Sequence, residues 1–174
     1  MSAPAIVWFR QDLRLSDNPA LTAAVDSGRP IIFLYILDDE TPAKWRIGAA
    51  QRWWLHKSLE ALDSDLQRKG CALTLRQGAA PRVLAQLIEE TGAELLCWNR
   101  CYEPFAVERD KALTQNLGVE IKSFGAALLH EPWDVKTGSG EPYKVFTPFW
   151  RAARSMPVRA ALAAPRALKS HQPP

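Results

Sequence analysis

Residues 5–9 read AIVWF, and residues 10–21 directly after them read RQDLRLSDNPAL. An unbroken apolar run of this length is typical of a strand in a parallel sheet that helices cover on both faces. The polar residues that follow predict a loop, and Pro19 fits the first turn of a helix because that turn needs no backbone N–H from it. The segment therefore predicts a strand, a loop and the start of a helix in an α/β fold.

The same alternation of strand-like and helix-like segments continues to about residue 125. Further strand-like runs lie at residues 31–37, 72–75, 94–98 and 119–124. The glycines expected to end the intervening helices are Gly28, Gly70, Gly92 and Gly118. The longest helix is predicted over residues 49–69, and one stripe of it carries Leu55, Leu59, Leu62 and Leu66. Since strand–helix–strand crossovers are right-handed, we predict a Rossmann-like or flavodoxin-like fold, a doubly wound five-stranded parallel sheet in a single domain.

The alternation stops beyond residue 125. The turn-rich stretch TGSGEP (residues 137–142) predicts irregular structure, and TPFWRAARSM (residues 147–156) predicts a last helix. Residues 157–174 are rich in alanine, arginine and proline and have little capacity to bury a core. We therefore expect an α/β domain over residues 1–156 and the start of an interdomain linker over residues 157–174.

Composition narrows the classes of function. The chain has 22 Lys and Arg against 19 Asp and Glu, a net charge of +3, without a block of like charges that would bind a polyanion. Its three cysteines form no even disulfide set, which favours a reducing compartment, and its three histidines lack metal-ligand spacing. No run approaches the ~18 apolar residues of a membrane helix, and no nucleophile–base pair stands out. We expect a cytoplasmic, monomeric protein with no metal site, no membrane partner and no catalytic residue of its own.

Three loops follow predicted strands at the edge where open α/β sheets bind ligands, namely residues 10–17, 38–44 and 99–104. The first contains no glycine, so it is neither a dinucleotide fingerprint nor a phosphate-cradling loop. One interpretation of its charges is an ion-pair latch made by Arg10, Asp12, Arg14 and Asp17.

Two further charges near these loops are open to a functional reading. Asp38 closes a strand, where it either faces a ligand as a hydrogen-bond acceptor or forms a turn and caps a helix. Arg52 lies near a helix start, where the dipole disfavours a cation, and this indicates a nearby partner. Of the seven tryptophans, Trp8 and Trp98 end predicted strands, and core packing is the expected role for most.

Five segments, in the same order, resemble the N-terminal domain of the DNA photolyase and cryptochrome family. They are VWFRQDLRLSDNPAL (residues 7–21), LYILDDE (34–40), RWWLHKSLEAL (52–62), WNRCYEP (98–104) and EPYKVFTPFWRA (141–152). The resemblance covers roughly residues 5 to 155. It implies the antenna-chromophore domain of a deoxyribodipyrimidine photolyase, of the bacterial type that repairs cyclobutane pyrimidine dimers.

In that family a helical domain follows, which binds FAD, contacts damaged DNA and performs the light-driven carbon–carbon lyase reaction. The resemblance therefore implies that the chain's partner is its own C-terminal FAD domain, that DNA is reached through that domain, and that these residues alone are inactive. Two alternatives remain open: the same domain of a cryptochrome photoreceptor, and a stand-alone nucleotide-binding module that shares the fold.

The resemblance also implies a cofactor site. In deazaflavin-binding members the antenna lies at the strand ends, and the matching positions are Arg10, Tyr35, Ile36, Asp38, Arg52 and Cys101. Cys101 stands where an acid is typical. Phe105 and Ala106 replace the Asn-Glu pair of one folate-binding group, so a deazaflavin- or flavin-type antenna, or an empty pocket, is expected before a folate. We further expect Asp38 to orient the antenna ring through a hydrogen bond.

Overall fold

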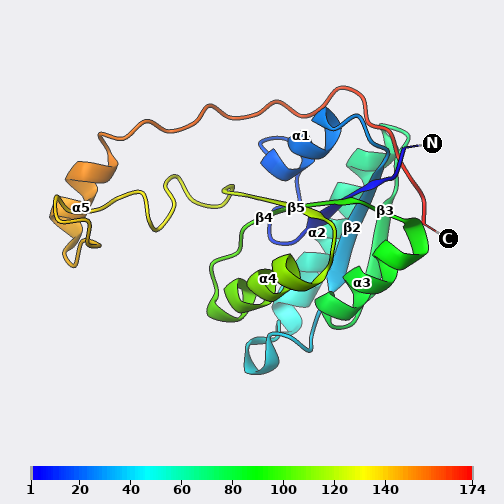
Figure 1. Ribbon diagram of the computed structural model, residues 1–174, viewed down its shortest axis with the longest axis horizontal. Helices are drawn as coiled ribbons and strands as arrows, with labels where there is room; N and C mark the ends of the chain where they lie inside the picture. The colour runs from blue at the N-terminus through cyan, green and yellow to red at the C-terminus, as the bar shows by residue number, and fades with distance from the viewer. Residues whose placement is uncertain (1, 174) are drawn as a thin grey trace.

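The computed structural model describes residues 2–173 and contains one five-stranded sheet (Figure 1). The strands are β1 (Ala5–Phe9), β2 (Ile31–Leu37), β3 (Leu73–Gln77), β4 (Leu95–Asn99) and β5 (Glu120–Phe124). The helices are α1 (Pro19–Asp26), the 3-10 turn η1 (Ala43–Trp45), α2 (Ala49–Gln67), α3 (Ala80–Thr91), α4 (Pro104–Asn116) and α5 (Phe146–Ala153). All strand pairs are parallel and their order is β3-β2-β1-β4-β5. The predicted doubly wound sheet is confirmed, with strand ends shifted by one or two residues.

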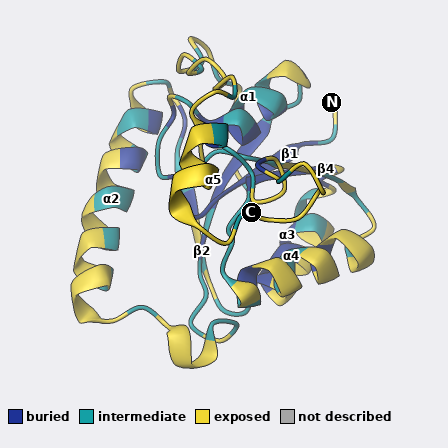
Figure 2. Cartoon of the chain, turned by 90° about the vertical axis from the view of Figure 1, so that its left-hand side faces the viewer, coloured by how far each residue is buried: buried dark blue, intermediate teal, exposed yellow. Residues whose placement is uncertain are grey.

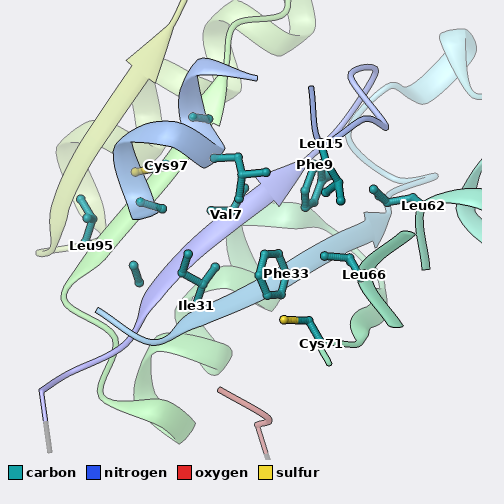
Figure 3. Packing of buried hydrophobic residues seen from close by; sticks show 14 residues of the cluster. Val7, Phe9, Leu15, Ile31, Phe33, Leu62, Leu66, Cys71, Leu95 and Cys97 are labelled. Carbon is teal, nitrogen blue, oxygen red and sulfur yellow. The ribbon is translucent and has the colours of Figure 1, made fainter. Parts of the chain in front are cut away.

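Two apolar cores cover the two faces of the sheet. Because successive side chains of a strand point to opposite faces, Val7 and Phe9 pack with α1 and α2, while Ile6 and Trp8 pack with α3 and α4. Figure 3 shows the first core, where Phe9 and Phe33 face Leu62 and Leu66 of α2. Burial on both faces explains why β1 is apolar at every position.

Helix α2 packs on the sheet through its second half only. Leu62 and Leu66 are buried, whereas Leu55 and Leu59 are half-buried and the first turns are exposed (Figure 2). The first two leucines of the predicted stripe are thus only partly covered, because hollows lie between these turns and the strand ends. The helix also ends at Gln67 rather than at residue 69.

The chain leaves the sheet after β5 and returns near its end. Helix α5, drawn in orange in Figure 1, stands away from the sheet, and it begins at Phe146, one residue before the predicted start. The following residues run back in extended form, and Ile31 N donates to Lys169 O at 2.7 Å while His171 N donates to Ile31 O at 2.8 Å. Leu168 packs against the first core. Residues 157–173 therefore lie along the domain, and the boundary at residue 156 stays a prediction.

No helix among the described residues is long and apolar enough to cross a bilayer.

Candidate ligand-binding crevice

The carboxyl ends of β1, β2 and β4 meet around one hollow of about 140 Å³. The chain reverses direction across the sheet here, because β2 flanks β1 on one side and β4 flanks it on the other. This switch point is where open α/β sheets bind ligands. Five of the six predicted site residues line the hollow, namely Arg10, Tyr35, Ile36, Asp38 and Cys101. We call this hollow the crevice.

A larger hollow of about 1010 Å³ adjoins the crevice, and Arg10, Gln11, Tyr35 and Ile47 line both. Its outer wall is the first half of α2, including Trp54. The two hollows together are large enough for a ligand of several fused rings.

Arg52, the sixth predicted residue, lies outside the crevice. Its Nη2 lies 2.7 Å from Asp39 Oδ1, so the cation at the helix start does have a partner. Arg52 lines a third hollow, between α2 and the ends of β2 and β3.

Arg10 forms part of the crevice wall through a buried ion pair. Its Nη1 lies 2.6 Å from Asp110 Oδ2, its Nη2 donates to Asn99 O, and its guanidinium lies 5.0 Å from the ring centre of Trp8. Arg109 Nη2 lies 2.8 Å from the other Asp110 oxygen, and the Arg109 guanidinium lies 4.6 Å from the ring centre of the same Trp8. Two cations thus share one carboxylate, and cation–π contacts with the indole add to their stability.

The predicted latch in the first loop is right for one pair and wrong for Asp12. Arg14 lies 3.8 Å from Asp17, whose carboxylate also binds Arg159 at 2.5 Å. Asp12 instead accepts hydrogen bonds from the amide groups of Asn18 and Asn99 and from Arg10 N. Asp12 is buried, and side-chain amides and a backbone N–H take the place of an arginine there.

Asn18 and Asn99 connect the carboxylate of Asp12 to the start of α1. Asn18 Oδ1 accepts from Leu21 N at 3.0 Å, as an N-cap does, and Asn99 Oδ1 accepts from Ala20 N at 3.1 Å. The amide network therefore fixes the ends of β1 and β4 and the first turn of α1 relative to one another.

The carboxylate of Asp38 accepts hydrogen bonds from its own loop and from the start of α3. Oδ1 accepts from Glu40 N at 3.0 Å and Thr41 N at 2.8 Å, while Oδ2 accepts from Thr41 Oγ1 and, at 2.9 Å, from Ala80 N at the start of α3. Burial raises the pKa of Asp38, but these hydrogen bonds outweigh it and hold the pKa below its usual range. The geometry favours the turn-and-cap interpretation of Asp38 over a hydrogen bond to a ligand ring.

Two neutral groups of the crevice have raised pKa values. Burial, with the Asp39 charge adding to it, raises the pKa of Tyr35 to about 12. Burial also raises the pKa of the Cys101 thiol. Both side chains are therefore uncharged near neutral pH, and the acid that is typical at position 101 is replaced by a weak donor.

Glu103 is a second carboxylate, in addition to Asp38, that lines the crevice. Burial raises its pKa, but the hydrogen bond from Gln11 Nε2 at 2.6 Å, backbone donors and the Arg10 charge together keep the pKa below its usual range. Its Oε2 is buried with no hydrogen-bond partner among the described residues. Sequence reasoning included Glu103 among the loop residues but missed the pairing of Arg10 with Asp110, since these residues lie far apart in the chain.

An open parallel sheet of order β3-β2-β1-β4-β5 with a crevice at its switch point defines a Rossmann-like α/β domain, and its first loop lacks the glycine-rich phosphate-binding sequence. Residues 5–167 match the family model described as DNA photolyase, and the chain belongs to this family.

Relatives of the chain include photolyases and cryptochromes. The chain is 53% identical over 154 residues to a deoxyribodipyrimidine photo-lyase of Agrobacterium fabrum, covering 87% of this chain and 32% of that protein. It is 41% identical over 157 residues to cryptochrome-1 of Arabidopsis thaliana, covering 88% of this chain and 23% of that protein.

A solved structure agrees with the fold as a whole. The crystal structure of a class III photolyase from Agrobacterium tumefaciens superposes with a TM-score of 0.91 at 48% identity, covering 99% of this chain and 36% of that one. The chain thus spans about a third or less of the length of these relatives.

Proposed function

We propose that the chain is the antenna-chromophore domain of a light-dependent pyrimidine-dimer photolyase. The observation that carries the proposal is the meeting of Arg10, Tyr35, Ile36 and Cys101 at one crevice, at the sheet's switch point, in a member of the photolyase family. When bound, the antenna absorbs light and passes its excitation to FAD in the rest of the protein.

The crevice residues bind and orient the chromophore. Tyr35 and Ile36 offer an aromatic and an aliphatic surface, while Arg10 offers a cation fixed by Asp110 before any ligand arrives. Cys101 and the Tyr35 hydroxyl are neutral donors toward ring carbonyls. Asp38 acts indirectly in this proposal, by holding the loop after β2 in place.

A deazaflavin- or flavin-type antenna fits these residues better than a folate. Phe105 lines the crevice and Ala106 is buried beside it, so neither supplies an amide or carboxylate at that edge. The favoured ligand is a flat, conjugated ring system of low charge.

The partner of this domain, in the proposal, is the FAD-binding domain of the longer protein, through which damaged DNA is reached. The segment around α5 supports this assignment, because its large apolar side chains are exposed. They are Leu128, Leu129, Trp133, Val145, Phe146, Phe149 and Trp150. A surface of this kind marks a protein contact. The protein is assigned to the cytoplasm as a monomer.

Reconstitution tests the antenna assignment. The purified chain is dialysed against 8-hydroxy-5-deazaflavin, FMN or methenyltetrahydrofolate, and bound ligand is quantified by absorption. We expect saturable binding of a deazaflavin or flavin at one site, with affinity lowered about tenfold or more by Tyr35→Ala. Arg82→Ala, an exposed change outside the crevice, is the control. Failure of all three ligands to bind, or full binding to Tyr35→Ala, contradicts the proposal.

The second candidate is the same domain in a cryptochrome, which the 41% identity to cryptochrome-1 favours. Under blue light, the longer protein is expected to reverse thymine dimers if it is a photolyase and to leave them intact if it is a cryptochrome. The 174-residue chain alone is expected to reverse none.

A further inference from the structure

The third hollow, about 440 Å³ in volume, lies between the first half of α2 and the ends of β2 and β3. Tyr35 lines this hollow, the crevice and the larger hollow beside it, so the three spaces meet around its side chain. The space beneath α2 is therefore next to the crevice, on the other side of Tyr35.

The walls of the third hollow are apolar and incompletely covered. They are formed by Leu37, Leu55, Leu59 and Leu75. Leu55 and Leu59 continue the apolar stripe of α2 but are only half-buried, and Leu75 is 56% exposed. Exposed leucine surface contributes no hydrophobic stabilisation, and a ligand that covered these leucines would gain that free energy on binding.

The polar residues that line the hollow include two arginines and, among the described residues, no acid. They are Arg52 and Arg76, which are cations, together with Tyr35, His56 and Gln77. The acids that hold the arginines lie outside the lining: Asp39 is 2.7 Å from Arg52, and Glu90 is 3.8 Å from Arg76.

Each arginine keeps donors for a further partner. Arg52 contacts its acid through Nη2, and Arg76 makes one long contact at 3.8 Å together with a bond of 3.5 Å to Leu75 O. A guanidinium has five N–H donors in a planar fork, which matches the oxygens of a phosphate or carboxylate. Two such forks over apolar walls suit a chain that ends in an anion.

We propose that the hollow beneath α2 binds the anionic tail of the antenna, a phosphate or carboxylate carried on a flexible chain, while the ring occupies the crevice. Arg52 and Arg76 bind the anion, and Leu55 and Leu59 cover the carbon chain. The inference rests on the proposed antenna function and adds the class of ligand: a ring with a negatively charged tail is selected over the same ring without one.

Riboflavin and FMN test the inference because they share a ring and a ribityl chain and differ only in the phosphate. Both are titrated into the chain at low ionic strength, with flavin fluorescence as the readout. We expect FMN to bind about tenfold more tightly than riboflavin. Arg76→Ala should remove most of this preference while leaving riboflavin affinity unchanged, and added salt should reduce it because salt screens half-exposed charges.

Arg68→Ala is the matched control, because Arg68 lies at the other end of α2, is exposed and is paired only with Asp65. It should keep the FMN preference in full. 5-Deazariboflavin and its 5′-phosphate form a second matched pair, in case the crevice selects the deazaflavin ring.

The outcomes separate the two proposals. If a ring binds but its phosphorylated form gains nothing, or if Arg76→Ala keeps the full preference, the tail site is wrong and the antenna function stands. If neither ring of either pair binds, the tail site and the deazaflavin or flavin preference are both wrong, and the antenna function itself is contradicted if methenyltetrahydrofolate also fails to bind.

Discussion

Arg10 Nη1 lies 2.6 Å from Asp110 Oδ2, although the two residues are a hundred positions apart in the sequence. Arg109 lies 2.8 Å from the second oxygen of the same carboxylate. All three side chains are largely buried. One aspartate on α4 therefore pairs with two arginines that line the crevice, and it fixes the position of Arg10.

Asp110→Ala should lower the free energy of unfolding by about 3–5 kcal/mol, because it leaves two guanidiniums buried without a counter-charge. Asp65→Ala removes an exposed pair with Arg68 and should cost at most about 1 kcal/mol. Urea denaturation of both variants measures the difference. Equal losses would mean that the buried pair contributes no more than a surface pair.

The loop after β2 should become less stable without the carboxylate of Asp38. This side chain accepts three backbone N–H groups and one hydroxyl, so Asp38→Ala should cost about 1–2 kcal/mol at pH 7. The exposed Asp26, changed to alanine, serves as the control.

The effect of Asp38→Ala should depend on pH in one direction. The folded-state pKa of Asp38 lies below its usual value, so its contribution is present above an unfolded-state pKa of about 3.9 and is lost as the pH falls through the folded-state pKa. Denaturation curves of both proteins should therefore converge in acid. A difference that grows as the pH falls would contradict this assignment.

Much of the fold could be predicted because its signals are local. The apolar runs that predict β1 and β2 each span only a few residues. Gly92 directly follows α3, and it ends that helix with φ 64° and with its N–H bonded to Ile88 O. The five crevice residues that the family resemblance named also lie together at one edge, at or after the carboxyl ends of β1, β2 and β4.

The features that sequence reasoning missed depend on distant partners. Asp12 binds Asn99, 87 positions away, and so takes an amide rather than the arginine expected from its neighbours. The half-buried state of Leu55 depends on the space between α2 and β3, which helical periodicity does not report. The docking of residues near Lys169 on Ile31 is equally non-local.

The second half of α2 should be indispensable to the fold. Leu62 is 1% exposed and packs in the core that α1 and α2 share, so Leu62→Ala should cost about 2–5 kcal/mol. Leu62→Asp should abolish cooperative unfolding, because it would bury an unpaired charge. Trp54→Asp, a 68% exposed position on the same helix, is the control. Circular dichroism melts distinguish the variants, and a cooperative melt for Leu62→Asp would contradict the packing.

The exposed aromatic residues of α5 should promote binding of apolar molecules and self-association of the chain. Phe146 and Trp150 are 71% and 50% exposed, and their rings stack at 6.4 Å. We expect the chain to bind an apolar dye such as anilinonaphthalene sulfonate and to associate as its concentration rises. The double change Phe146→Ser and Trp150→Ser should reduce both effects while altering the free energy of unfolding by about 0.5 kcal/mol or less.

A change at an equally exposed aromatic outside this segment tests the assignment. Trp45 is 69% exposed and lies on η1. If Trp45→Ser reduces dye binding and association as much as the double change on α5 does, the apolar contact surface does not lie on α5.

Gly125 begins the segment that leads from β5 toward α5. A Cβ at Gly125 would overlap the carboxylate of Glu131, which lies 2.7 Å from Arg100 Nη2 and accepts from the Tyr102 hydroxyl at 2.9 Å. Gly125→Ala should therefore displace Glu131, cost about 1–3 kcal/mol in urea denaturation, and speed proteolysis within residues 126–145. Gly138→Ala, where no atom lies within 4 Å of the added Cβ, should change neither quantity. Only the Cβ added at Gly125 meets Glu131, and the Cβ added at Gly138 meets no atom. If the two variants behave alike, Glu131 does not hold this segment against the end of β4.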